Sequence, residues 1–520
     1  MTDTYLLTPV AQELELRNLS SDSKWIMSGF DCAYAQWEPP VYFFRIDEIL
    51  DADELKNGLQ CVVNECPILA TRLQVDKLPF TFGHFQGVQF KVVTVDDESI
   101  QLPDHRSLME DWEKMGIVEL LKPAKEVPIL ELSMMNAGMV RFLKQNVTIL
   151  GIFRQHVVGD GYACCRIFHR WSYLSAKNAG KLASLNAKNL EIGKEPLQNT
   201  RLLFTQTLGT SLPCKDIDLS LLSTGRIHKY FSGSDNLALL KYELEMKRFG
   251  GSSQKPDLPW LEFRVPVTHI KYLKCTLLES LQVLQQTHVW ENEVTWLSTF
   301  ECVAAIMLAS KLRANFNNET IVKLLPLCSF IVNTRSRFKD LADVANTDIG
   351  PAAYMMLGKY FSAEFLATAR KLDGSVAFIA LCAWYFHQSL QDELANSQAI
   401  AEELAVVQHL PNHTARASNG DMEKTRFVKI DISACAKREE MASLNSWATF
   451  DWLDVNFGSN QPRVHSMSRS RPGFPNYWFQ YQACSHEIAA VMSFKTQNEC
   501  ELVKKEMKNL IDVSNLLIFC

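Results

Sequence analysis

Residues 154–161 place one histidine where it could act as a base. His156 follows an apolar, β-branched run, residues 147–153, which predicts a buried strand that ends beside the imidazole. Asp160 and Gly161 are turn residues, and the apolar residues after them recur at helical spacing. Imidazole is the usual general base near neutral pH. The order strand, histidine, turn, helix therefore predicts a site for proton abstraction.

A second segment, residues 452–462, carries an acidic side chain, Asp454. Asp454 has two interpretations: it handles a second proton, or it forms one half of an ion pair that fixes its loop. Asp160 also has two: it orients the imidazole, as the acid of a catalytic triad does, or it holds the turn. Gly161 is explained by the backbone freedom required where the chain leaves the strand for the helix.

Together the two segments resemble the paired signatures of the BAHD-type acyltransferases, His-x-x-x-Asp(-Gly) and Asp-Phe-Gly-Trp-Gly, in the expected order. The second signature departs from the family pattern at Val455, Asn456 and Phe457, which stand for Phe, Gly and Trp. This weaker form is more typical of fungal members than of plant members. The likeness covers most of the chain, because five further stretches resemble family motifs: residues 27–31, 41–45, 66–73, 297–305 and 332–338.

The resemblance implies a chloramphenicol-acetyltransferase-like α/β fold with mixed sheets, built as two domains with the active site in a channel at their interface. We expect residues 1–200 to form the N-terminal half, which carries His156. Residues 201–258 include polar, turn-forming residues and are the predicted crossover between the two halves. Residues 259–520 are then the C-terminal half. A length of 520 residues suits two cores better than one.

The resemblance also implies roles for individual residues. His156 is the expected general base, and the acyl donor is acyl-CoA as a co-substrate, with no bound cofactor and no metal. Asp454 is expected at the catalytic site, paired there with Arg335. The remaining expected site residues are structural at Asp160, Gly161 and Gly458, and substrate-binding at Asn456, Phe457 and Thr299.

Composition narrows the class of protein. Hydrophobic residues make up 47% and charged residues 22%, which is typical of a soluble globular protein. A net charge of −6 gives no electrostatic reason to bind nucleic acid or an anionic membrane surface. The longest apolar run, residues 376–386, is too short to span a bilayer and predicts a core helix. The N-terminus has no secretory signal pattern, and 14 scattered cysteines favour reduced thiols and a cytoplasmic location.

Other types of site are disfavoured. The pair His409 and His413 has metal-ligand spacing, but Pro411 between them disfavours the helix that would bring both imidazoles to one face. Cys164 and Cys165 are close to His156 in sequence but are typical of packing residues. There is no Gly-x-Ser-x-Gly and no P-loop, so the standard serine-hydrolase and nucleotide-dependent classes are disfavoured.

The expected function is therefore transfer of an acyl group from acyl-CoA to a hydroxyl of a small, specialised-metabolite acceptor by a monomeric enzyme. Gln155 stands where peptide-synthetase condensation domains of this fold carry a second histidine, which favours a free-standing enzyme with a diffusible donor. Two alternatives remain open: N-acylation of an amine, and a catalytically silent binding or scaffold protein of the same fold.

Overall fold

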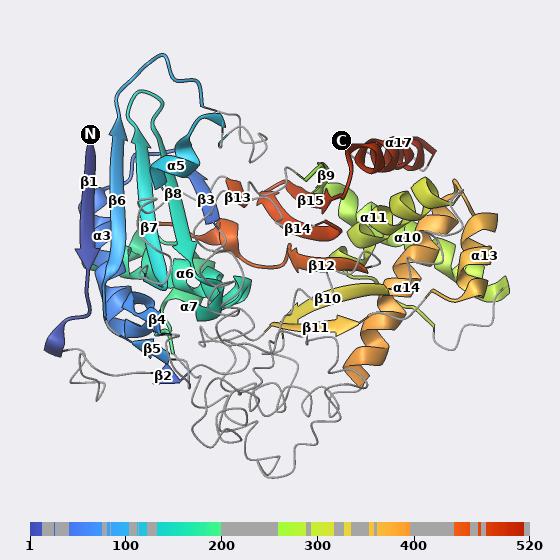
Figure 1. The fold of residues 1–520 in the computed structure, drawn as a ribbon, viewed down its shortest axis with the longest axis horizontal. Helices are drawn as coiled ribbons and strands as arrows, with labels where there is room; N and C mark the ends of the chain where they lie inside the picture. Colours follow the sequence, from blue (N-terminus) through green and yellow to red (C-terminus); the bar gives the residue numbers. More distant parts are fainter. Residues whose placement is uncertain are drawn as a thin grey trace, which may run out of the picture.

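The computed structural model contains two six-stranded mixed sheets and a small three-stranded sheet. The structure describes residues 1–12, 25–26, 41–74, 81–83, 85–102, 112, 114–121, 133–198, 258–287, 293–316, 327–333, 353–357, 361–395, 441–457, 466–469 and 475–513. The first large sheet is at the left of Figure 1 and the second is to its right.

The first sheet has the order β1-β6-β7-β8-β3-β13. Its strands are β1 (Thr2–Leu7), β6 (Val88–Val95), β7 (Met135–Phe142), β8 (Val147–Arg154), β3 (Val41–Ile46) and β13 (Ser466–Arg469). The small sheet contains β2 (Trp25–Ile26), β5 (Thr81–Gly83) and β4 (Arg72–Gln74). The helices of this half are α3 (Ala52–Glu65), α5 (Ile117–Leu121), α6 (Gly161–Asn178) and α7 (Ala187–Gly193).

The second sheet has the order β11-β10-β12-β14-β15-β9. Its strands are β11 (Ala353–Leu357), β10 (Leu327–Asn333), β12 (Met441–Trp447), β14 (Tyr477–Cys484), β15 (Glu487–Ser493) and β9 (Trp260–Pro266). The helices of this half are α10 (Val267–Thr287), α11 (Thr299–Asn315), α13 (Ala363–Lys371), α14 (Val376–Ala395) and α17 (Gln497–Val513). The apolar run at residues 376–386 is thus part of a helix, as its composition predicts.

Strand β8 is buried along all eight of its residues because the first sheet is covered on both faces. Successive residues alternate between two clusters: Leu150 packs in the main core with α3 and α6, whereas Ile149 packs in a smaller core with α5. A Cβ on Gly151 would meet Leu121 of α5 at 2.9 Å, so the glycine lets this helix approach the sheet. Burial on both faces explains why the strand reads as an unbroken apolar run.

Strand β13 belongs by sequence to the C-terminal part of the chain, yet it extends the first sheet. It pairs antiparallel with β3, where Ser466 lies opposite Arg45 and Arg469 lies opposite Tyr42 (Figure 1). The two parts of the chain are therefore joined by strand pairing as well as by side-chain packing. No described helix is long and apolar enough to cross a membrane.

Residues 451–456, which follow β12, are held against α6 and α7 by hydrogen bonds to their backbone carbonyls. Asn189 is central to this contact: its Nδ2 donates to Asn456 O at 3.1 Å and to Ser172 Oγ at 2.8 Å. Its Oδ1 lies 2.6 Å from Nδ1 of His169, and Ser172 Oγ also donates to Asn456 O. Asn189 is completely buried, so water does not replace its hydrogen bonds to these partners.

Three further hydrogen bonds extend this contact along the segment. In each of them one partner is a backbone carbonyl: Asn186 Nδ2 donates to Asp454 O at 2.7 Å, Asn456 Nδ2 donates to Ser184 O at 3.2 Å, and His169 Nε2 lies 2.8 Å from Asp451 O. Phe457 adds an apolar contact, edge-on to Phe168 and Trp171 at centroid distances of 5.3 and 5.4 Å. Segment 451–457 is therefore fixed to the helix that begins directly after the His156 turn.

Replacing Asn189 by Ala should lower the free energy of unfolding by about 2 to 3 kcal/mol, because it removes three buried hydrogen-bonding contacts, with His169, Ser172 and Asn456. Urea denaturation monitored by tryptophan fluorescence measures this. The matched control is Asn178→Ala, which removes an exposed amide at the end of α6 and should change stability by less than about 0.5 kcal/mol. Equal effects of the two substitutions would show that the contact contributes nothing.

Candidate active site

His156 lies directly after β8, in a short 3₁₀ turn (His156–Val158) that leads into α6. Asp160 is the N-cap of α6: its carboxylate accepts from the backbone N–H of Ala163 at 3.0 Å. The predicted order of strand, histidine, turn and helix is confirmed for these elements. The Asp160 carboxylate satisfies an N–H that the helix leaves unpaired, which supports a structural role for this residue.

Arg154, at the end of β8, fixes the turn that carries His156 by hydrogen bonds. Its side chain is completely buried and donates to the carbonyl of Gly159 and to the hydroxyl of Tyr42, the latter at 3.2 Å. The guanidinium also lies close enough to Asp160 to interact electrostatically with it. Charged hydrogen bonds of this kind are stronger than neutral ones. The backbone that carries His156 is therefore held at both ends.

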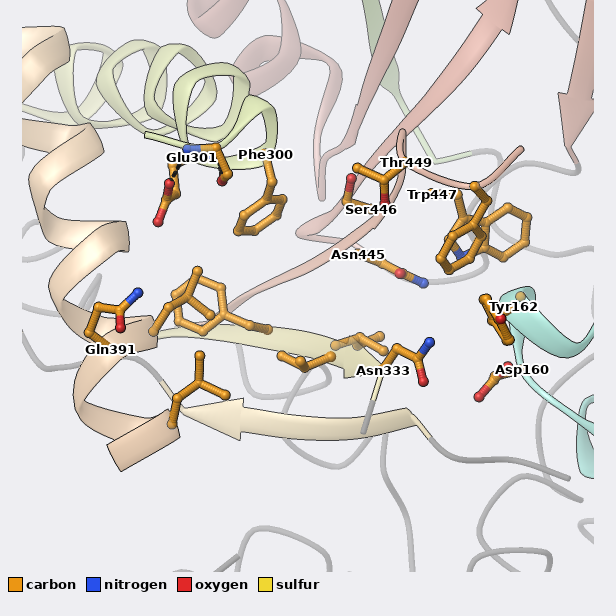
Figure 2. Close-up of a pocket in the computed structure, with 18 of the residues that line it drawn as sticks. Asp160, Tyr162, Phe300, Glu301, Asn333, Gln391, Asn445, Ser446, Trp447 and Thr449 are labelled. Atoms are coloured by element: carbon orange, nitrogen blue, oxygen red, sulfur yellow. Dashed lines mark hydrogen bonds between the residues drawn. The ribbon is translucent and has the colours of Figure 1, made fainter. Parts of the chain in front are cut away.

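A cavity of about 280 Å³ lies between the two parts of the chain. Residues from the turn and from α6 form one wall, and residues of the second sheet, of the segment before α11, of α11 and of α14 form the others (Figure 2). The residues lining it are His156, Asp160, Gly161, Tyr162, Trp296, Ser298, Phe300, Glu301, Phe330, Ile331, Val332, Asn333, Leu390, Gln391, Leu394, Asn445, Ser446, Trp447, Thr449 and Phe450.

Two asparagines at strand ends supply polar groups to this cavity. Asn333 ends β10 and Asn445 is near the end of β12; the two strands are parallel, with Ile331 opposite Asn445. Asn445 Nδ2 donates to the hydroxyl of Tyr477 at 3.0 Å, which fixes its amide. Figure 2 shows both amides facing the space beside Asp160. Sequence analysis missed them, although polar residues at the ends of two apolar strands were the signal that could have found them.

The reason for Gly161 differs from the expected one. Its backbone is not in the left-handed region, where Gly87, Gly116, Gly180 and Gly374 are found. A Cβ at Gly161 would instead lie 2.4 Å from Cε2 and 2.5 Å from Nε1 of Trp447. The expectation of backbone freedom is therefore wrong: the glycine is required because the indole of β12 packs directly on the first turn of α6.

The other expected site residues lie away from the cavity lining or outside the described residues. Asp454 is half-buried beneath α7, and its carbonyl accepts from Asn186. Asn456 and Phe457 are buried against α6, and Thr299 begins α11 without lining the cavity. Arg335 and Gly458 lie outside the described residues, so the pairing of Asp454 with Arg335 stays a prediction, as do the substrate contacts.

The thiols near His156 are buried packing groups. Burial raises the pKa of Cys164 to about 11 and the pKa of Cys165 well above its ordinary value. A thiol acts as a nucleophile in its deprotonated form, which these pKa values disfavour near neutral pH. Among the described residues no cluster of three or more potential metal ligands occurs; His409 and His413 lie outside them.

No family model matches the chain, and no curated protein matches it in sequence. Solved structures match its fold over nearly the whole length. TRI101 of F. graminearum, complexed with coenzyme A and T-2 mycotoxin, is 13% identical with a TM-score of 0.60, covering 93% of this chain and 97% of that one. Vinorine synthase is 14% identical with a TM-score of 0.55, covering 98% of each chain.

These likenesses agree with the arrangement of two mixed sheets and their helices that the resemblance in sequence implies. The chain therefore has the two-domain, chloramphenicol-acetyltransferase-like fold of the BAHD-type acyltransferases.

Proposed function

We propose that this protein transfers an acyl group from an acyl-CoA thioester to a hydroxyl of a small-molecule acceptor, with His156 as general base. The observation that carries the proposal is the position of His156 in the cavity between the two halves, opposite the polar ends of β10 and β12. The fold supports it, because the similar F. graminearum TRI101 was solved with coenzyme A. A specialised-metabolite acceptor, a monomeric state and a cytoplasmic location belong to the same proposal.

His156 moves the proton in both steps of the reaction. The acceptor oxygen attacks the thioester carbon and forms the new C–O bond while His156 takes the hydroxyl proton. The C–S bond then breaks, and the proton passes from His156 to the departing sulfur. No covalent enzyme intermediate is needed, which agrees with the buried state of Cys164 and Cys165.

Negative charge develops on the thioester oxygen during this transfer and requires hydrogen-bond donors. The amide of Asn445 and the hydroxyl of Ser446 line the same cavity as His156. Tyr477 orients the Asn445 amide, so the donor is in place before the substrate arrives. Donors arranged in advance stabilise such charge more effectively than water does. We therefore assign the end of β12 to this role in the proposal.

His156→Ala should lower kcat by at least about 100-fold, because it removes the base but leaves the cavity. The assay measures CoA released from acetyl-CoA with a metabolite extract that supports turnover by the wild type. His486→Ala, which removes an exposed imidazole between β14 and β15, is the matched control and should keep full activity. Unchanged turnover in His156→Ala would contradict the mechanism. An absence of CoA release in the wild type with any extract would favour the silent binding protein.

Gly161→Ala should lower both stability and kcat, because the new methyl overlaps the indole of Trp447 and overpacking of this kind costs about 1 to 3 kcal/mol. Thermal unfolding and CoA release measure the two effects. Adding Trp447→Phe makes room for the methyl. The double variant should therefore lose less stability than the sum of the single variants. Strict additivity would show that the two residues do not compete for the same space.

A further inference from the structure

Glu301 places a buried carboxylate in the wall of the cavity. It lies in the first turn of α11 and is 1% exposed. Figure 2 shows Glu301 and Gln391 toward one end of the cavity and Asp160 and Tyr162, from the His156 turn, at the other. Burying a carboxylate is costly unless it interacts with donors or with a cation. The carboxylate therefore requires an explanation beyond its place in the helix.

Helix capping does not explain the charge. Ser298 and Glu301 form a capping box: the hydroxyl of Ser298 accepts from the Glu301 N–H at 3.2 Å, and Oε2 of Glu301 accepts from the Ser298 N–H. Glutamine serves equally well at this position of a capping box. A neutral amide would thus cap α11 without the cost of a buried carboxylate.

His387 holds the second oxygen of the carboxylate. Its Nδ1 lies 3.0 Å from Oε1 of Glu301, and the imidazole is only 5% exposed and does not line the cavity. Among the described residues, the Ser298 N–H and the His387 imidazole are the groups that contact the carboxylate oxygens, whereas a carboxylate has about four acceptor positions. The carboxylate is thus fixed by these two residues and can still accept hydrogen bonds from a ligand.

The surroundings of Glu301 favour a ligand that carries a cationic group at the end of an apolar chain. Trp296 is 53% exposed, lines the cavity, and stands edge-on to His387 at 5.1 Å between ring centroids. Exposed indole faces attract cations. The cavity lining also includes several apolar side chains: Phe300, Phe330, Val332, Leu390 and Leu394.

We propose that this end of the cavity binds the protonated amine of a substrate whose reacting group lies at the His156 end, with Glu301 as the acceptor and Trp296 as the aromatic contact. The inference rests on the proposed function. The bound amine is distinct from the nucleophile, since a protonated amine has no lone pair with which to attack a thioester. The amine belongs either to the acyl chain or to the acceptor, and its chemistry at Glu301 is the same in both cases.

Two matched probe series distinguish these sources. One compares ω-aminooctanoyl-CoA with octanoyl-CoA, and the other compares ω-amino-octanol with octanol. Isothermal titration calorimetry on the full chain should show that the wild type binds the amino member of one series at least about tenfold more tightly than its methyl-ended partner. Glu301→Gln should reduce that ratio to about one, because the charge is lost while the capping box is kept.

Glu279→Gln removes an exposed charge from α10 and is the matched control, so its preference should equal that of the wild type. Trp296→Leu changes an exposed residue outside the capping box and should also weaken the preference, which keeps the proposal testable if Glu301→Gln unfolds. A preference absent from both series, or retained in Glu301→Gln, would overturn the proposal. CoA release is measured separately, so turnover without the preference refutes this site alone, and the preference without turnover refutes acyl transfer alone.

Discussion

The hydrogen bonds from α6 and α7 to the backbone of residues 451–456 are the interaction on which the rest of the site depends. Helix α6 begins directly after the His156 turn, and β12 ends just before residue 451. Asn189 thus joins the element that carries the base to the strand that carries Asn445 and Trp447. This contact lies outside the cavity, yet it fixes the two opposing walls of the cavity relative to each other.

This arrangement gives the second sequence motif a structural role. The structure shows Asp454 and Asn456 contributing carbonyl oxygens to the contact with α7 and α6, while Phe457 packs against the aromatic residues of α6. The carbonyl contacts of Asp454 and Asn456 do not depend on residue type, whereas the Asn456 amide and the Phe457 ring make contacts of their own. The departures from the family signature at residues 455–457 are understandable on this basis.

The sequence predicted elements whose signal is local. The apolar run before His156 predicted β8, and the run at residues 376–386 predicted part of α14, because each pattern reflects burial of that segment alone. The reason for Gly161 was missed because it depends on Trp447, 286 positions away along the chain. The pairing of β13 with β3 and the carbonyl contacts of Asn189 leave no pattern of residue types, so only the folded chain reveals them.

The two acidic side chains that line the cavity, Asp160 and Glu301, are each held by hydrogen bonds within their own half of the chain. Asp160 is the acid nearest to His156 in sequence, and its charge is committed to the positive end of α6 through the N–H of Ala163. Glu301 belongs to the other half of the chain and is held there by Ser298 and His387. The proposal therefore uses Glu301 at one end of the cavity and His156 at the other, with the acid nearest to His156 engaged in capping a helix.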